Sequence, residues 1–238
     1  ESAEVPSGDP SLDVADGGSR VKSEEAHSYE IGSKMVLFNR SVHLNAAVFY
    51  TEILDFQETS FLVTETSAGF LTQNVDVEST GFELDGKYQI NEDWRLLGAV
   101  TNADTVHTDD GSDLAQAPKW TGNIGYFHER ELLDGDYYLT TTGFARYRGE
   151  MVSQINETFP SDSLTTFDFT VGLISGDDIW KVMLIAQNVT NARTTDFSGP
   201  PAGPIGAILG APPGDQGITS ETLNPQRMIK LQFTYNFF

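Results

Sequence analysis

Carboxylates are the side chains of this sequence with the greatest capacity for chemistry. Their tightest group is the acidic run from Asp109 to Asp113 (Asp-Asp-Gly-Ser-Asp), whose closely spaced oxygens are the type of ligand that Ca²⁺ prefers. The run lacks the later bidentate Glu that completes an EF-hand loop. Acidic loop residues are usually solvated. We therefore expect a hydrated loop and predict no resident metal ion or cofactor.

Histidines, carboxylate pairs and glycines do not have the spacing of a metal, glycosidase or phosphate site. The four histidines, at positions 27, 43, 107 and 128, share no metal-ligand spacing, and we expect His27 and His107 to lie at the surface near long loops. Glu83 and Asp85 share a strand face, but Lys87 continues it, which indicates a polar wall rather than the isolated carboxylate pair of a glycosidase. No glycine-rich motif opens a helix after a strand, so phosphate binding has no support. The sequence predicts no catalytic residue.

These side chains are carried by strands. Apolar and polar residues alternate along the chain, and no ten-residue segment has helical periodicity. The pattern predicts about nine strands, at residues 28–38, 42–57, 70–90, 94–104, 119–130, 136–149, 165–173, 180–188 and 227–238.

The connections between the predicted strands alternate in length. Short turns are expected near residues 39, 91, 134 and 176, and long connections at about 58–69, 105–118, 150–163 and 189–226. Strict alternation places every long connection at the same end of an antiparallel sheet. This segregation is typical of bacterial outer-membrane barrels, whose periplasmic turns are short and whose extracellular loops are long.

The last strand has an apolar face that continues to the end of the sequence. A soluble protein rarely leaves such a face at a free terminus, where it would fray into water. A membrane barrel requires it, because its final strand faces lipid and pairs to close the sheet. We therefore predict an all-β fold, an antiparallel up-and-down transmembrane β-barrel of which this chain is a part. The residues assigned to this assembly strand are Ile229, Leu231, Phe233, Tyr235, Phe237 and Phe238.

The three tryptophans lie at predicted strand ends. Trp94 and Trp180 begin strands after short turns, and Trp120 begins one after a long connection. Amphipathic rings at both ends of spanning strands form the aromatic girdles of membrane barrels. The alternative is that they are ordinary core aromatics.

Composition excludes several classes of protein. Thirty-five acidic residues oppose 14 basic ones, a net charge of −21, which argues against nucleic-acid binding and against a basic patch for anionic lipid. The absence of cysteine excludes a disulfide scaffold and a thiolate metal site. The apolar runs are shorter than the roughly 18 residues of a transmembrane helix. The acidic excess is compatible with attraction of cationic or metal-laden substrates and equally with a saline habitat.

The chain is expected to be part of a longer protein. We divide it into a polar loop region, residues 1–25, and a C-terminal barrel portion, residues 26–238. Single-chain bacterial barrels have an even number of strands, and an open sheet of nine would leave two unpaired edges. The missing strands are expected upstream.

Six segments of the chain share a family pattern: residues 28–34, 45–52, 74–84, 117–120 and 187–191, and the aromatic terminal strand. In these segments the chain resembles the C-terminal part of the barrel of TonB-dependent outer-membrane receptors, and the resemblance runs from about Glu24 to Phe238. One departure is Phe238, which follows the residue in register with the apolar face.

The resemblance implies a barrel of about 22 strands plugged by an N-terminal domain. By the same implication, the protein lies in the outer membrane of a Gram-negative bacterium and takes up a ferric siderophore, cobalamin or a glycan with energy relayed through TonB. Its other partners would be outer-membrane lipid and, through the last strand, the barrel-assembly machinery. It would not be an enzyme. A passive porin, and a soluble all-β carbohydrate-binding or adhesion module, remain the alternatives.

Overall fold

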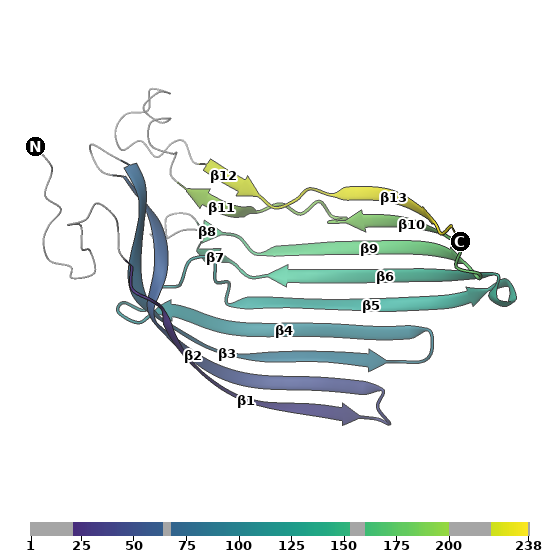
Figure 1. The fold of residues 1–238 in the computed structure, drawn as a ribbon, viewed down its shortest axis with the longest axis horizontal. Coiled ribbons are helices and arrows are strands. Elements are labelled where there is room, and N and C mark those ends of the chain that lie inside the picture. Colours follow the sequence, from purple (N-terminus) through teal and green to yellow (C-terminus); the bar gives the residue numbers. More distant parts are fainter. Residues whose placement is uncertain (1–20, 64–67, 153–159, 200–219, 238) are drawn as a thin grey trace, which may run out of the picture.

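A computed structural model describes residues 21–63, 68–152, 160–199 and 220–237, and these form one main antiparallel sheet (Figure 1). Its nine strands are neighbours in space in the order in which they occur in the chain. They are β1 (Glu25–Leu37), β2 (Val42–Val63), β3 (Ala68–Gln89), β4 (Trp94–His107), β5 (Trp120–Leu132), β6 (Tyr137–Arg148), β9 (Leu164–Ser175), β10 (Trp180–Gln187) and β13 (Met228–Tyr235).

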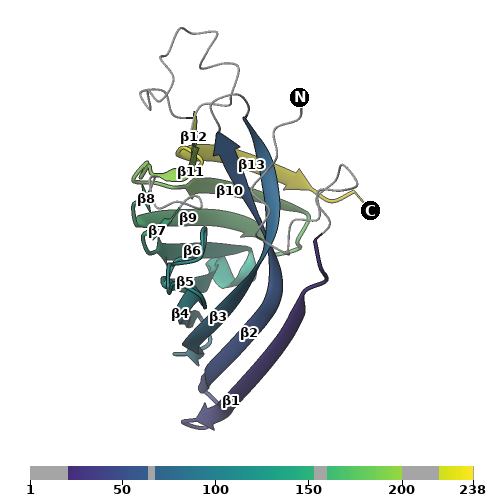
Figure 2. The same cartoon turned by 90° about the vertical axis from the view of Figure 1, so that its left-hand side faces the viewer.

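This arrangement confirms the predicted fold class. The described strands pair sequentially, as an up-and-down topology requires, and the sheet curves without closing on itself (Figure 2). The only helical turn within the described residues is the 3-10 turn Leu133–Gly135. In that part of the chain, no helix has the length and apolarity needed to cross a membrane.

Left-handed backbone conformations and local hydrogen bonds end the strands at the short turns. Phe38, Asn39 and Arg40 take left-handed backbone conformations, and the Ser41 N–H donates to the Phe38 carbonyl at 3.1 Å. At the next short turn the Asn91 side-chain oxygen accepts hydrogen bonds from two following backbone N–H groups, an arrangement that favours a tight turn. These turns lie at the end of the sheet that carries the C-terminus (Figure 1).

Two long connections contain small sheets of their own. The connection after β6 holds β7 (Met151–Val152) and β8 (Pro160–Ser161), and the connection after β10 holds β11 (Thr195–Gly199) and β12 (Ser220–Leu223). An isolated bridge between Val106 of β4 and Asp113 folds the connection after β4 back onto the end of that strand. The long connections lie together at one end of the sheet, as the alternation of lengths predicts (Figure 1).

The prediction of a long loop at residues 58–69 is wrong. Strands β2 and β3 pair from Val42↔Tyr88 to Val63↔Ala68, so only residues 64–67 separate them. Between Ile53 and Phe56 the register shifts by one residue, a β-bulge with Asp55 in a left-handed conformation (φ 55°). Beyond the bulge the hairpin bends out of the sheet and rises across its open side (Figure 2).

Candidate functional site

The sheet has one apolar face that is not covered by protein. Cross-strand register places Ala46, Leu84 and Val100 side by side on this face, and it places Leu184 opposite Leu231. Leu231 is 72% exposed, and Val77 is the only fully buried hydrophobic among the side chains that the structure describes. A sheet of a soluble domain would bury such a face against a second layer.

Along the strands the apolar side chains are more exposed than the polar ones, which is the reverse of the pattern in a soluble protein. On β9, Phe167 and Phe169 are exposed, whereas the residues that alternate with them, Thr166, Asp168 and Thr170, are half-buried. Side chains on the outside of a curved sheet splay apart and those on the inside crowd together. The apolar face is therefore the convex one.

The opposite face carries polar contacts between strands. Asn45 donates to the Asp85 carboxylate at 2.9 Å, which agrees with the predicted polar wall. Arg146 forms an ion pair with Asp168, and the Arg95 guanidinium lies over the Phe127 ring at 4.7 Å. These contacts indicate a wetted inner wall rather than a second apolar layer.

The tryptophans lie at the two ends of the apolar face. Trp94 and Trp180 are the first residues of β4 and β10 at the short-turn end, and Trp120 is the first residue of β5 at the other end. Each packs against another aromatic ring: Trp94 against His128 (4.2 Å between centroids), Trp180 against Tyr137 (5.9 Å) and Trp120 against Phe82 (5.8 Å). Their assignment to aromatic girdles stays a prediction, compatible with these positions.

The last strand pairs along its length with β10, from Trp180↔Tyr235 to Gln187↔Met228. Its apolar residues share the convex face, with Phe233 64% exposed, and the Tyr235 and Phe237 rings are 4.8 Å apart. Phe238 lies outside the described residues. The role of this strand in assembly also stays a prediction.

The acidic run after β4 is used for local structure. Hydrogen bonds from the Ser112 side chain and from the Ser112 N–H, the latter at 2.8 Å, lower the pKa of Asp110. Asp113 pairs with Lys119 at 3.2 Å. Within the described part of the chain, no three His, Cys, Asp or Glu side chains are grouped as metal ligands would be.

The surface expectation for His107 is wrong. His107 ends β4 on the inner face and is 9% exposed, with its Nε2 3.1 Å from the carboxylate of the equally buried Glu58 on β2. His27, by contrast, is exposed beside Glu25. Glu58 and His107 are 49 positions apart in the chain, so no spacing could have joined them.

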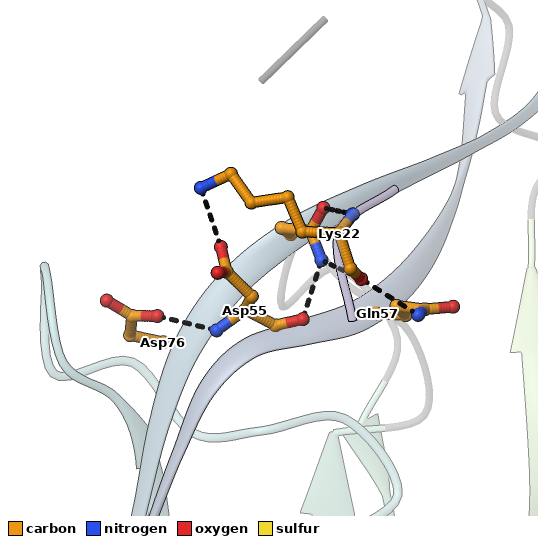
Figure 3. A network of polar contacts seen from close by, with 5 residues as sticks. Lys22, Asp55, Gln57 and Asp76 are labelled. Atoms are coloured by element: carbon orange, nitrogen blue, oxygen red, sulfur yellow. Dashed lines mark hydrogen bonds and ion pairs between the residues drawn. The ribbon is translucent and has the colours of Figure 1, made fainter. Parts of the chain in front are cut away.

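The bulge at Asp55 is held by the segment that precedes β1 (Figure 3). The Lys22 ammonium donates to the Asp55 carboxylate at 3.0 Å, and the Asp55 N–H donates to the Asp76 carboxylate at 2.8 Å. Asn74 donates to the Asp55 carbonyl at 2.6 Å, and Gln57 donates through its side chain to the Lys22 carbonyl at 3.0 Å. Backbone groups that the bulge removes from the ladder are thus satisfied by side chains.

Asn188 joins the two ends of the longest connection. It is 6% exposed, donates to the Ala192 and Pro225 carbonyls at 2.9 and 3.0 Å, and accepts from the Ala192 N–H at 2.9 Å. Asn224 completes the closure by accepting from the Thr194 N–H at 2.8 Å. The sequence resemblance included Asn188, but nothing in its spacing indicated this role.

Asn188→Ala is expected to destabilise the full-length protein by about 1–3 kcal/mol, because it removes the three hydrogen bonds that the buried Asn188 side chain makes. Urea-unfolding midpoints in detergent measure the effect. Asn123→Ala, at an exposed position of the inner face, is the control and should stay within about 0.5 kcal/mol of the parent. Equal midpoints for the two variants would contradict the closure role of Asn188.

A sequential antiparallel sheet with an exposed apolar convex face, aromatic residues at both ends and segregated long connections defines the barrel class of fold. A family model described as "TonB dependent receptor-like, beta-barrel" matches residues 2–191. The chain therefore belongs to the TonB-dependent receptor family and forms part of its barrel.

Relatives of known sequence include receptors for siderophores and metals. The ferrichrome outer membrane transporter/phage receptor of Escherichia coli (strain K12) is 24% identical over 187 residues, which are 76% of this chain and 24% of the transporter. The metal-pseudopaline receptor CntO of Pseudomonas aeruginosa (strain UCBPP-PA14) is 28% identical over 120 residues, 48% of this chain and 16% of the receptor.

Solved structures show the same fold. The ferric yersiniabactin uptake receptor FyuA of Yersinia pestis superposes with a TM-score of 0.72 at 17% identity, over 90% of this chain and 30% of the receptor. The copper transporter OprC gives a TM-score of 0.70 at 16% identity, over 92% of this chain and 33% of the transporter. The chain thus spans between a quarter and a third of the length of the ferrichrome transporter and of these two solved receptors.

Proposed function

We propose that this chain is the C-terminal barrel portion of an outer-membrane receptor that imports a metal chelate of the ferric siderophore class, with energy supplied through TonB. The observation that carries the membrane assignment is the exposed apolar convex face, on which Ile124 is 64% and Phe233 64% exposed. Hydrocarbon is the medium in which such a face is stable, and a closed barrel is the only sheet that spans it.

The substrate class is proposed from the relatives. Their names refer to ferrichrome, metal-pseudopaline and ferric yersiniabactin, all of which place a metal or its chelate in the transported cargo. The cobalamin and glycan classes have no such support among these relatives. The acidic composition of the chain suits a cationic or metal-laden cargo at the outer mouth.

The partners follow from the same proposal. Lipid of the outer membrane covers the convex face, and the barrel-assembly machinery recognises the last strand. TonB engages a region of the full-length protein outside this sequence. The protein carries cargo without chemical change, so it is not an enzyme.

Uptake of a radiolabelled ferric siderophore panel by cells that express the full-length protein tests the proposal. We expect accumulation of at least one ferric chelate in cells with functional TonB, and none in otherwise identical cells that lack it. Accumulation that is independent of TonB would favour a passive porin. Recovery of the protein in the aqueous fraction without detergent would favour a soluble carbohydrate-binding or adhesion module.

A further inference from the structure

One buried charged pair connects the β2–β3 hairpin to the rest of the sheet. The Glu58 carboxylate on β2 is 3.1 Å from His107 Nε2 at the end of β4, and the two side chains are 7% and 11% exposed. The second carboxylate oxygen of Glu58 is buried without a hydrogen-bond partner. Neither residue contributes to the apolar face.

The pair lies outside the apolar band of the sheet. Asn102 on β4 is paired with Trp120 at the long-connection end of that band, and β4 continues beyond this level to His107. Glu58 follows the Asp55 bulge along β2, in the part of the hairpin that bends out of the sheet (Figure 2).

His107 contacts a second segment through its other ring nitrogen. Nδ1 is 3.0 Å from the Ser112 hydroxyl and 3.2 Å from the Ser112 carbonyl, within the connection that follows β4. The Ser112 carbonyl also accepts the backbone N–H of His107 at 2.9 Å. One imidazole therefore bridges the outer half of the hairpin and the 108–119 connection.

The groups that face this imidazole are acidic or acceptors. Burial lowers the pKa of His107, but the hydrogen bond and charge of Glu58, the Ser112 backbone and the charge of Asp110 raise it, and the net pKa lies above the ordinary value. On the β3 side the cross-strand partner is the buried Val77. Asp76 and Glu78 flank Val77 and point to the opposite face of the strand.

Positive charge in the 108–119 connection does not oppose the rise in the pKa of His107. The basic residue of this connection, Lys119, forms ion pairs with Asp104 at 2.9 Å and with Asp113 at 3.2 Å. The protonated imidazole can donate from both nitrogens, to the Glu58 carboxylate and to the Ser112 carbonyl. The neutral imidazole has one donor only, so the charge of the pair with Glu58 is lost, and Nδ1 keeps a contact with Ser112 only by accepting from the Ser112 hydroxyl.

We propose that Glu58 and His107 form a proton-controlled clamp that holds the outer half of the β2–β3 hairpin against the 108–119 connection while the His107 imidazole is protonated and loosens its hold when the imidazole becomes neutral. Because the folded pKa of His107 lies above its unfolded value, the stabilisation is complete below the unfolded value and is lost as the pH rises through the folded one. The clamp does not depend on which substrate the protein carries.

Hydrogen exchange of the full-length protein in detergent tests the clamp. We expect residues 56–63 to exchange several-fold more slowly at about pH 5.5 than at about pH 8.5, after correction for the intrinsic rates. His107→Gln, which keeps a donor but cannot titrate, should remove this pH dependence. His43→Gln, on the inner face of β2 near the short turn that precedes this strand, should leave it unchanged.

Two results would overturn the clamp. The first is equal protection of residues 56–63 at both pH values, or a pH dependence in His107→Gln that equals that of the parent. The second needs no variant and stands even where His107→Gln fails to assemble. It is a titration midpoint of the parent's His107 ring, followed by NMR, at or below the ordinary value of about 6.5.

Discussion

Replacing Phe233, Tyr235 and Phe237 together with Ser is expected to abolish assembly of the full-length protein in the outer membrane. Phe233 and Tyr235 lie on the convex face, the Phe237 ring packs against the Tyr235 ring, and the exposed fractions of the three side chains are 64%, 47% and 90%. Burying a large apolar side chain contributes about 1.5–3 kcal/mol, so the triple change removes several kcal/mol of lipid contact from one strand. Immunoblots of the outer-membrane fraction measure the loss.

The same strand supplies a matched control. Lys230, Gln232 and Thr234 lie on the opposite face and keep the same backbone pairing with β10. Their combined replacement with Ser should leave the outer-membrane amount close to that of the parent. If both triple variants reached the membrane in normal amounts, the last strand would not direct assembly through its apolar face.

The strands could be predicted because each one is specified locally. The alternation of Phe82 and Leu84 with Glu83 and Asp85 fixes both the strand and its two faces, and register then extends the faces across the sheet. Segregation of long and short connections followed from the same pattern, and the structure confirms it for the long connections after β4, β6 and β10, whereas only residues 64–67 separate β2 from β3.

The extended hairpin could not be predicted, since its support is not local. Residues 58–69 mix polar, small and apolar types without clean alternation, which favours a loop. The strand pairing continues there because Lys22 and Asn74 hydrogen-bond to the side chain and the carbonyl of Asp55 at the bulge. Lys22 and Asn74 are 52 positions apart in the chain. Across the hairpin, the hydroxyls of Thr59 and Thr72 bond at 2.9 Å.

The polar contacts near the long connections escaped prediction for the same reason. Glu58 meets His107 only after β2, β3 and β4 have paired, and Asn188 meets Pro225 only after a connection of 37 positions has closed. Hydropathy patterns report which face a residue occupies. They do not report which distant polar group it reaches on that face.

A single arginine on the convex face is expected to have the second-largest effect. Leu84 is 39% exposed there and lies opposite Ala46 and Val100, between the levels of Trp94 and Trp120. Placing a guanidinium in hydrocarbon near the bilayer midplane costs about 2–4 kcal/mol. Leu84→Arg should lower the unfolding free energy of the full-length protein in lipid vesicles by that amount, as measured by urea titration.

The adjacent residue tests which face of the strand is covered by an apolar medium. Glu83 points to the inner face, where Asp85 and Lys87 already carry charge, so Glu83→Arg introduces the same side chain into a wet wall and should change stability by less than about 0.5 kcal/mol. Val171→Arg and Thr170→Arg on β9 form a second such pair, since these neighbours also lie on opposite faces. Equal losses within each pair would contradict a sheet with one apolar covering and one wet face. Because a soluble sandwich also buries one face of each strand, the lipid assignment depends on the loss being measured in the protein inserted in vesicles.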